Sequence, residues 1–295
     1  MIALALLGRD MVYEIAQGVD WTKLVRTPAM KGHVDAVLTA SSADRRRKTA
    51  DGTLQTVYRT AFELGRPVRT GLAQVAAMAP EDHEHLKDYL YADRDTRGWF
   101  ACGYGPWRRL PRSKSLDRSS HALRTSERKP YRFATMFSAE SALTQVNDWL
   151  VDLDYKRLKE KEEDSESQTA QRVFRLAIKA LETMSPGLTF ATITDQGDVI
   201  FEEHGLQVSI DCLSDGYRGT IAWVGDLIRR LVSAFPRLDN PLEAQGVVLV
   251  DELDIPLHPQ WQRSIVEQVR FLFPNLQFVV SSHSPFVAQD VGPED

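Results

Sequence analysis

Cysteine is scarce in this 295-residue sequence, which contains only Cys102 and Cys212. Two isolated cysteines exclude a disulfide framework and the paired spacings of structural zinc sites. Because disulfide-stabilised proteins belong to oxidising compartments, we expect a cytoplasmic protein. Both cysteines are expected to be small buried hydrophobic residues.

Long apolar runs are also missing, and no membrane-spanning helix is expected, since a span takes roughly 18–20 apolar residues. The first ten residues, MIALALLGRD, lack the basic region and the cleavage site of a signal peptide. The net charge of −5 excludes a general attraction to nucleic acids, so any such contact requires a local basic patch. Hydrophobic residues make up 43% and charged residues 26%, as in a folded globular protein of one large or two ordinary domains.

The first hundred residues give mixed signals. A short helix is expected over 1–7, ending at Gly8. HVDAVLTASS (33–42) alternates like a strand, and after a polar turn TLQTVYRTAFEL (53–64) fits either a strand or a short helix. Residues 72–91 are predicted to form helices interrupted by Pro80, and 99–107 a buried strand that ends at a Gly-Pro turn.

The middle of the chain predicts three further parts. Residues 108–132 are rich in Lys and Arg and are expected to form a loop that is either simply solvated or in contact with DNA phosphates. The candidate DNA contacts there are Arg108, Arg109, Arg112 and Lys114. Residues 141–184 read as a pair of helices with a charged tip around 159–168, and 189–210 as antiparallel strands with turns at Asp195-Gln196-Gly197 and Gly205.

The stretch VVLV (247–250), followed by Asp251 and Glu252, is the most informative. A continuous run of β-branched residues is typical of a strand buried on both faces of a parallel sheet. Ligand sites in such sheets lie at the carboxyl ends of the strands. Asp251 is therefore a candidate Mg²⁺ ligand and Glu252 a candidate general base, unless the pair is only the solvated end of the strand. Leu257-His258-Pro259 is predicted to lead into a helix with Pro259 at its first position.

Two further segments carry candidate site residues. CLSDGYRGTIAWVGDLIRRL (212–231) predicts a helix from Gly216 or Tyr217, and Ser214 with Asp215 stands at its N-terminus, as an anion site or as an ordinary helix cap. LQFVVSSHSPF (276–286) predicts another buried strand, ending at Ser281, Ser282 and His283, where a histidine either bonds a phosphate or has a structural role.

The order of these three segments resembles that of ABC-type P-loop ATPases of the SMC, RecF and overcoming-lysogenization-defect group, which are also grouped as AAA-family ATPases. LSDGYRG (213–219) resembles their signature motif, VVLVDE (247–252) their Walker B motif, LDIPLHP (253–259) their D-loop and SSH (281–283) their switch histidine. The resemblance extends less specifically to GYGPWRRL (103–110) and to the helix beginning at Met136.

The resemblance implies roles for individual residues. Asp251 would bind Mg²⁺, Glu252 would polarise the attacking water and His283 would sense the γ-phosphate of ATP. The signature residues would contact ATP held by a second subunit, which implies a homodimer. These are Ser214, Asp215, Gly216 and Tyr217; Asp254 and His258 would lie near the dimer seam.

The resemblance also implies an α/β P-loop NTPase fold with a mostly parallel central sheet, an antiparallel β subdomain and a helical insertion. We expect the first part of the ATPase core in residues 1–107, the basic loop, helical insertion and β-hairpin in 108–205, and the rest of the core in 206–295.

The loop that gives these ATPases their phosphate site, G-x-x-x-x-G-K-[ST], is absent from the sequence. We expect the chain to begin downstream of it, inside the following helix, and the chain alone to have negligible ATP turnover. The leading hypothesis is an ATPase domain in DNA repair or phage defence, with ATP and Mg²⁺ as cofactors. The alternatives are an inactive interaction module for an effector protein or a paralogue, and the nucleotide-binding subunit of a transporter.

Overall fold

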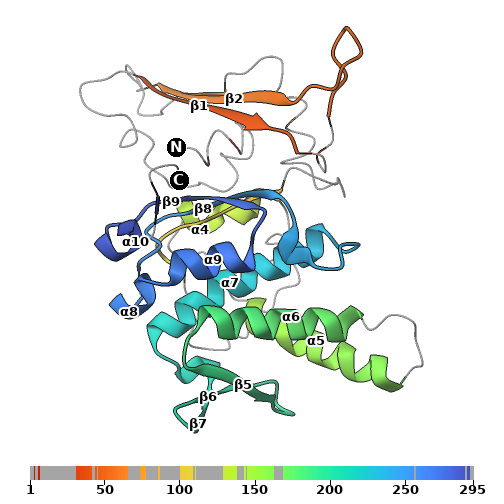
Figure 1. Cartoon of the computed structure of the whole chain (residues 1–295), viewed down its shortest axis with the longest axis vertical. Helices are drawn as coiled ribbons and strands as arrows, with labels where there is room; N and C mark the ends of the chain where they lie inside the picture. The colour runs from red at the N-terminus through yellow and green to blue at the C-terminus, as the bar shows by residue number, and fades with distance from the viewer. Residues whose placement is uncertain are drawn as a thin grey trace.

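The structure is a computed structural model of the chain, and its layers follow one another along the longest axis (Figure 1). It describes residues 31–41, 44, 46–65, 74–77, 100–108, 110, 129–137, 143, 145–162, 169–255, 257–289 and 291–292, together with Ala3, Leu6 and Leu86. An antiparallel sheet forms one end, a parallel sheet and its helices form the middle, and a small antiparallel sheet forms the other end (Figure 1).

The central sheet is parallel and contains β4 (Phe100–Tyr104), β8 (Gly246–Val250) and β9 (Leu276–Val280) in that order. Its central strand is therefore the predicted VVLV run. The prediction that β9 is also buried was wrong, because Val279 and Val280 are 37% and 40% exposed. Among the described strands β9 pairs with β8 alone, which leaves its outer edge without a partner strand there.

The two faces of this sheet belong to two hydrophobic clusters. Cys102, Tyr104 and Val248 lie in the cluster that includes the helix over residues 215–234, whereas Ala101 and Leu249 lie in the cluster shared with the antiparallel sheet that contains the strands over 31–39 and 57–65. This separation follows from the alternation of side chains along a strand. Hydrophobic side chains cover both faces of β4. This packing holds β4 and its neighbour β8 in place and does not depend on the candidate site residues.

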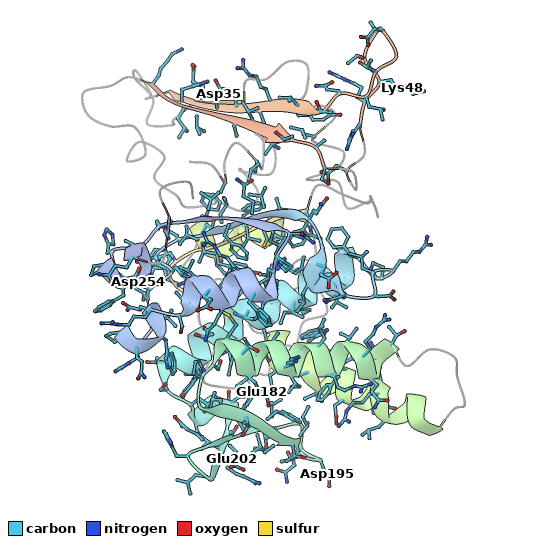
Figure 2. All side chains as sticks on the ribbon, in the orientation of Figure 1. Asp35, Lys48, Glu182, Asp195, Glu202 and Asp254 are labelled. Atoms are coloured by element: carbon cyan, nitrogen blue, oxygen red, sulfur yellow. The ribbon has the colours of Figure 1, made fainter. Side chains whose placement is uncertain are left out.

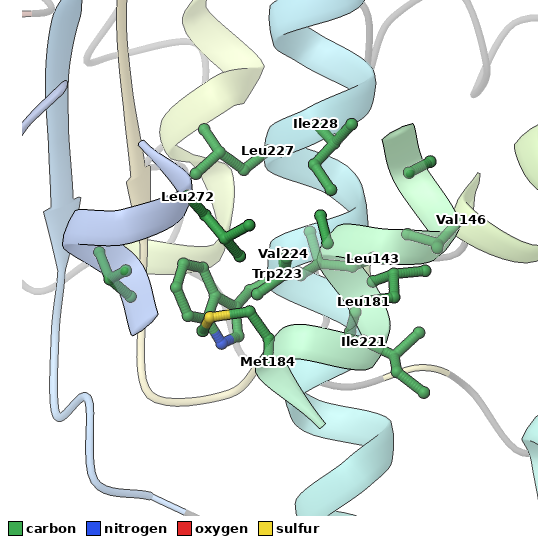
Figure 3. Packing of buried hydrophobic residues seen from close by; sticks show 14 of the residues in the cluster. Leu143, Val146, Leu181, Met184, Ile221, Trp223, Val224, Leu227, Ile228 and Leu272 are labelled. Atoms are coloured by element: carbon green, nitrogen blue, oxygen red, sulfur yellow. The ribbon is translucent and has the colours of Figure 1, made fainter. Parts of the chain in front are cut away.

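Helix α7 (Asp215–Ala234) is the centre of the larger cluster, and α5 (Gln145–Glu162) and α6 (Thr169–Met184) pack against it. Figure 3 shows its Ile221, Val224 and Ile228 meeting side chains from the neighbouring helices. The predicted helical pair is thus confirmed. Helix α9 (Ile265–Leu272) adds its buried Ile265, Val269 and Leu272 to the same cluster.

A charged group is buried between α7 and β4. Asp226 accepts hydrogen bonds from Arg229 at 2.9 Å, Arg230 at 2.5 Å and the Tyr104 hydroxyl at 3.0 Å. Burial raises the pKa of Asp226, but the two guanidinium groups outweigh it and the net pKa is lowered. The carboxylate is therefore ionised and paired, as a buried charge must be.

The antiparallel sheets account for the remaining strands. One contains β1 (Lys31–Thr39), β2 (Val57–Gly65) and β3 (Gln74–Ala77); the other contains β5 (Leu188–Ile193), β6 (Val199–Glu203) and β7 (Leu206–Ser209). The strand alternative for 53–64 is confirmed over β2, and the predicted strands of 189–210 are confirmed. The helical prediction for 72–91 was wrong at β3, where pairing with β2 determines the conformation. The other described residue of that range is Leu86, which is helical and buried.

Short helices complete the described chain: η3 (Lys129–Phe133), α4 (Ala134–Phe137), η4 (Ile210–Cys212), η5 (Pro241–Glu243), α8 (Pro259–Gln262) and α10 (Pro285–Gln289).

Cys102 is buried as predicted, but Cys212 is exposed. Within the described ranges, no helix is long and apolar enough to cross a membrane. The expected α/β class, with its parallel sheet, antiparallel sheets and helical pair, is confirmed, and the three-part domain division stays a prediction.

Candidate hydrolytic site at the carboxyl end of the parallel sheet

The carboxyl ends of the three parallel strands meet at Asp251. Its N–H donates to the carbonyl of Tyr104 at 2.8 Å, which extends the pairing with β4 by one residue. On the other side, the Ser281 N–H donates to the Val250 carbonyl at 3.0 Å. Asp251 and Glu252 therefore leave the sheet directly beside Ser281, as expected from the parallel order.

Ser281 is bonded to both acidic residues. Its hydroxyl accepts a hydrogen bond from the Glu252 N–H at 2.8 Å and donates a short one to Asp251 Oδ1. Glu252 itself has φ +50°, in the left-handed region that residues with a Cβ seldom adopt. A carboxylate beside a hydroxyl is an oxygen donor set of the kind that Mg²⁺ accepts, usually with water and phosphate completing its shell. Among the described residues, no group of three or more His, Cys, Asp or Glu side chains forms a closed metal site.

The next carboxylate, Asp254, is bonded to the residues that follow β9. Its Oδ1 accepts hydrogen bonds from the Ser282 hydroxyl at 2.6 Å and from the His283 N–H at 3.2 Å (Figure 2 labels Asp254). Burial raises the pKa of Asp254, but these hydrogen bonds more than offset it, and the net pKa is below the ordinary value. The His283 side chain is exposed at the same edge.

The predicted turn into α8 is confirmed. His258 caps the helix, because its Nδ1 accepts from the Gln260 N–H at 3.3 Å, and Pro259 occupies the first helical position. Gln262 of α8 donates to the carbonyl of Leu257 at 2.9 Å and accepts from the Ser284 hydroxyl at 2.6 Å. Hydrogen bonds thus join the segment after β8 to the segment after β9 at two places, near Asp251 and near Gln262.

Arg108 holds the same segment from the β4 side. It is 2% exposed, and its guanidinium donates to the carbonyls of Asp251 at 2.5 Å, Glu252 at 2.9 Å and Ile255 at 2.8 Å. Burial lowers its pKa to about 10, although the nearby carboxylates oppose this effect, so the group remains charged at neutral pH. The prediction that Arg108 contacts DNA was wrong, because the side chain is buried in these carbonyl bonds.

Between β4 and Arg108 the chain passes very close to another segment. A Cβ added at Gly105 would lie 2.0 Å from the Thr135 carbonyl oxygen, so only glycine fits there. Sequence reasoning missed the role of Arg108 by assigning it to the basic loop. The available signal was its position right after a Gly-Pro turn at the end of a buried strand. The other predicted DNA contacts, Arg109, Arg112 and Lys114, lie outside the described residues.

The predicted signature residues form the first turn of α7. Ser214 is the N-cap residue, but its side chain makes no capping hydrogen bond, and Ser214 and Asp215 are exposed. The position of the Tyr217 side chain differs from that expected for a nucleotide contact. Its side chain is 7% exposed, its hydroxyl donates to the Pro186 carbonyl at 2.8 Å, and its ring lies 4.4 Å from that of Trp261. Packing against α8 therefore turns this side chain away from the mouth of the helix, which Ser214, Asp215 and Gly216 form.

The arrangement consists of acids at the end of a central parallel strand, a Ser-Ser-His turn on the neighbouring strand and a separate open helix N-terminus. Comparison with known proteins gives a matching result. A family described as "AAA domain, putative AbiEii toxin, Type IV TA system" matches residues 56–288. The chain belongs to this family. The predicted P-loop ATPase relationship is thereby confirmed.

Three curated proteins are similar to parts of this chain. The retron Vc95 probable ATPase of Vibrio cholerae is 46% identical over 33% of this chain and 19% of its own length, and the retron Ec83 probable ATPase of Escherichia coli is 38% identical over 32% and 17%. The Septu protein PtuA of Bacillus mycoides is 30% identical over 62% of this chain and 22% of its own length. The matched part thus spans about a fifth of the length of these relatives.

The comparison with solved structures also gives two matches of low structural similarity. The head domain of SMC from Pyrococcus furiosus, bound to the C-terminal domain of ScpA, covers 98% of this chain and 80% of its own, with a TM-score of 0.46 and 13% identity. A RecF structure covers 92% and 80%, with a TM-score of 0.35 and 12% identity.

Proposed function

We propose that the carboxyl end of the parallel sheet hydrolyses Mg²⁺-bound ATP. The observation that carries this proposal is the position of Asp251 and Glu252 at the end of β8, with Ser281 and His283 at the same edge. Asp251 and the Ser281 hydroxyl would hold Mg²⁺, which neutralises charge on the phosphates when it is bound. Glu252 would take a proton from the attacking water, and His283 would donate a hydrogen bond to the γ-phosphate.

The open N-terminus of α7 fits the second half of such a site. Ser214 and Gly216 would bind the γ-phosphate of ATP held by another copy of the chain, so that ATP closes a homodimer. The exposed hydroxyl of Ser214, which makes no capping hydrogen bond to α7, supports a role toward a partner. In this arrangement Asp254 and His258 lie near the seam, where they order the loop that faces the partner.

The test requires the phosphate-holding loop, which the 295-residue sequence does not contain. A suitable protein carries a G-x-x-x-x-G-K-[ST] segment ahead of residue 1, from an upstream in-frame start or from a relative. In that protein, Asp251→Asn should raise the Mg²⁺ concentration for half-maximal ATP turnover by about 10–100-fold, because a charged ligand is lost. Asp211→Asn, at an exposed aspartate, is the matched control. An unchanged Mg²⁺ requirement in Asp251→Asn would rule out this metal site.

The biological setting that we propose is phage defence, with an effector protein as partner, and the retron and Septu names of the relatives support this choice over DNA repair. The alternative function is a catalytically inactive module that docks to an effector or a paralogue. Co-purification of an effector with a Glu252→Gln, Asp251→Asn variant, together with full defence activity, would support the inactive module over the ATPase.

A further inference from the structure

Glu252 is held in an unfavourable backbone conformation. It is one of two non-glycine residues with a positive φ among the described residues, and it is the proposed general base. A residue with a Cβ stays in the left-handed region only when its surroundings fix the backbone on both sides. The structure shows which groups do this.

The two peptide planes on either side of Glu252 are each bonded at both ends. In the plane before it, the Asp251 carbonyl accepts from Arg108 Nη1 at 2.5 Å and the Glu252 N–H donates to Ser281 Oγ at 2.8 Å. In the plane after it, the Glu252 carbonyl accepts from Arg108 Nη2 at 2.9 Å and the Leu253 N–H donates to the Ser281 carbonyl at 2.9 Å. Because φ and ψ of Glu252 are the rotations between these planes, the four bonds determine both angles.

We propose that Arg108 is a positioning residue that, with Ser281, forces Glu252 into the left-handed conformation and so directs its carboxylate. The part of this inference that concerns catalysis rests on the proposed function. The planar guanidinium places two N–H groups on consecutive carbonyls, whereas a lysine ammonium is a single point with no such fork. Arg108→Lys therefore keeps the charge and removes the geometric constraint.

A double-mutant cycle on the 295-residue chain tests the constraint without nucleotide. Glycine at position 252 has no left-handed penalty, so Glu252→Gly relieves strain only while Arg108 imposes that strain. Glu252→Gly should lower the equilibrium constant for unfolding in urea. The factor of this decrease should be about fivefold larger in the protein with Arg108 than in the Arg108→Lys background. Arg229→Lys, at a buried arginine bonded to Asp226, is the matched control and should show no coupling.

Additive effects of Arg108→Lys and Glu252→Gly would overturn the proposal. If Arg108→Lys does not fold, Ser281→Ala takes its place in the cycle, because the Ser281 hydroxyl accepts from the Glu252 N–H at the opposite end of the plane that Arg108 Nη1 bonds. In the protein supplied with the phosphate loop, Arg108→Lys should lower kcat about tenfold and leave KM nearly unchanged, as for a misplaced general base. Coupling in the cycle together with full ATP turnover in Glu252→Gln would keep the positioning role of Arg108 and refute the proposed role of Glu252 as general base.

Discussion

The loop after β8 and the first turn of α7 were both predicted as parts of one active site, yet their surroundings differ. The loop is bonded on three sides, by Arg108, by Ser281 and Ser282, and by Gln262. At the start of α7, Ser214 and Asp215 are exposed, and the Ser214 side chain makes no capping hydrogen bond to α7. The difference suggests that one half of the proposed site is ordered within the chain, while the other half is presented to a partner.

A large expected effect separates these halves by mixing two variants of low activity. Ser214→Asp places a negative charge where the phosphate of a partner would bind and should lower ATP turnover about 10–100-fold in the loop-bearing protein. An equal mixture of Ser214→Asp and Glu252→Gln should recover about a quarter of the normal turnover, since half of the dimers contain one intact site. No recovery in mixed dimers that are verified by differential tagging would place both residues in the same subunit's site.

A smaller effect is expected where the two regions touch. The Trp261 ring of α8 packs against Tyr217 of α7, so Trp261→Ala should lower the free energy of unfolding by about 2 kcal/mol, below the usual core value because Trp261 is partly exposed. Urea unfolding of the 295-residue chain measures this free energy of unfolding. Trp107→Ala, at a tryptophan that is 43% exposed, is the control and should change it by less than about 0.5 kcal/mol. Equal losses in the two variants would mean that the ring contact adds nothing.

The smallest expected effect concerns Asp254. Its pKa is lowered on folding, so its ionised form stabilises the protein above the ordinary aspartate pKa of about 3.9, and the contribution is lost as the pH falls through the folded value. Asp254→Asn should cost about 1 kcal/mol at pH 7, a discounted value because the group is partly exposed. The difference between variant and parent should shrink toward acid pH. A difference that grows on acidification would contradict the assignment.

The sequence was sufficient for the strands and helices whose pattern is set by local burial. VVLV became the centre of the parallel sheet, and the helical pair and the turn at His258-Pro259 followed from periodicity and proline chemistry. Residues 74–77 were misjudged because pairing with the preceding strand β2, which the local helical pattern does not reveal, decides their conformation. β9 was misjudged because an apolar run does not reveal whether a strand lies at an edge.

The candidate site was predictable in its residue types but not in its bonding. The Gly-Pro turn before Arg108 indicates that its side chain lies at the end of a buried strand, but it does not indicate that the guanidinium reaches the carbonyls of residues 251–255, more than a hundred positions away. Likewise, Tyr217 resembles a motif residue in sequence, but its hydroxyl is committed to the Pro186 carbonyl. Long-range hydrogen bonds to backbone groups carry no sequence pattern, and this accounts for both errors.

The most direct measurement is single-turnover hydrolysis of bound ATP by the loop-bearing protein with Glu252→Gln. The matched control is Glu267→Gln, the same change at an exposed glutamate of α9. The account predicts that Glu252→Gln binds ATP normally and hydrolyses it about 10²–10⁴-fold more slowly, the usual contribution of a general base, while the control is unaffected. Hydrolysis at the parental rate in Glu252→Gln would contradict the proposed site.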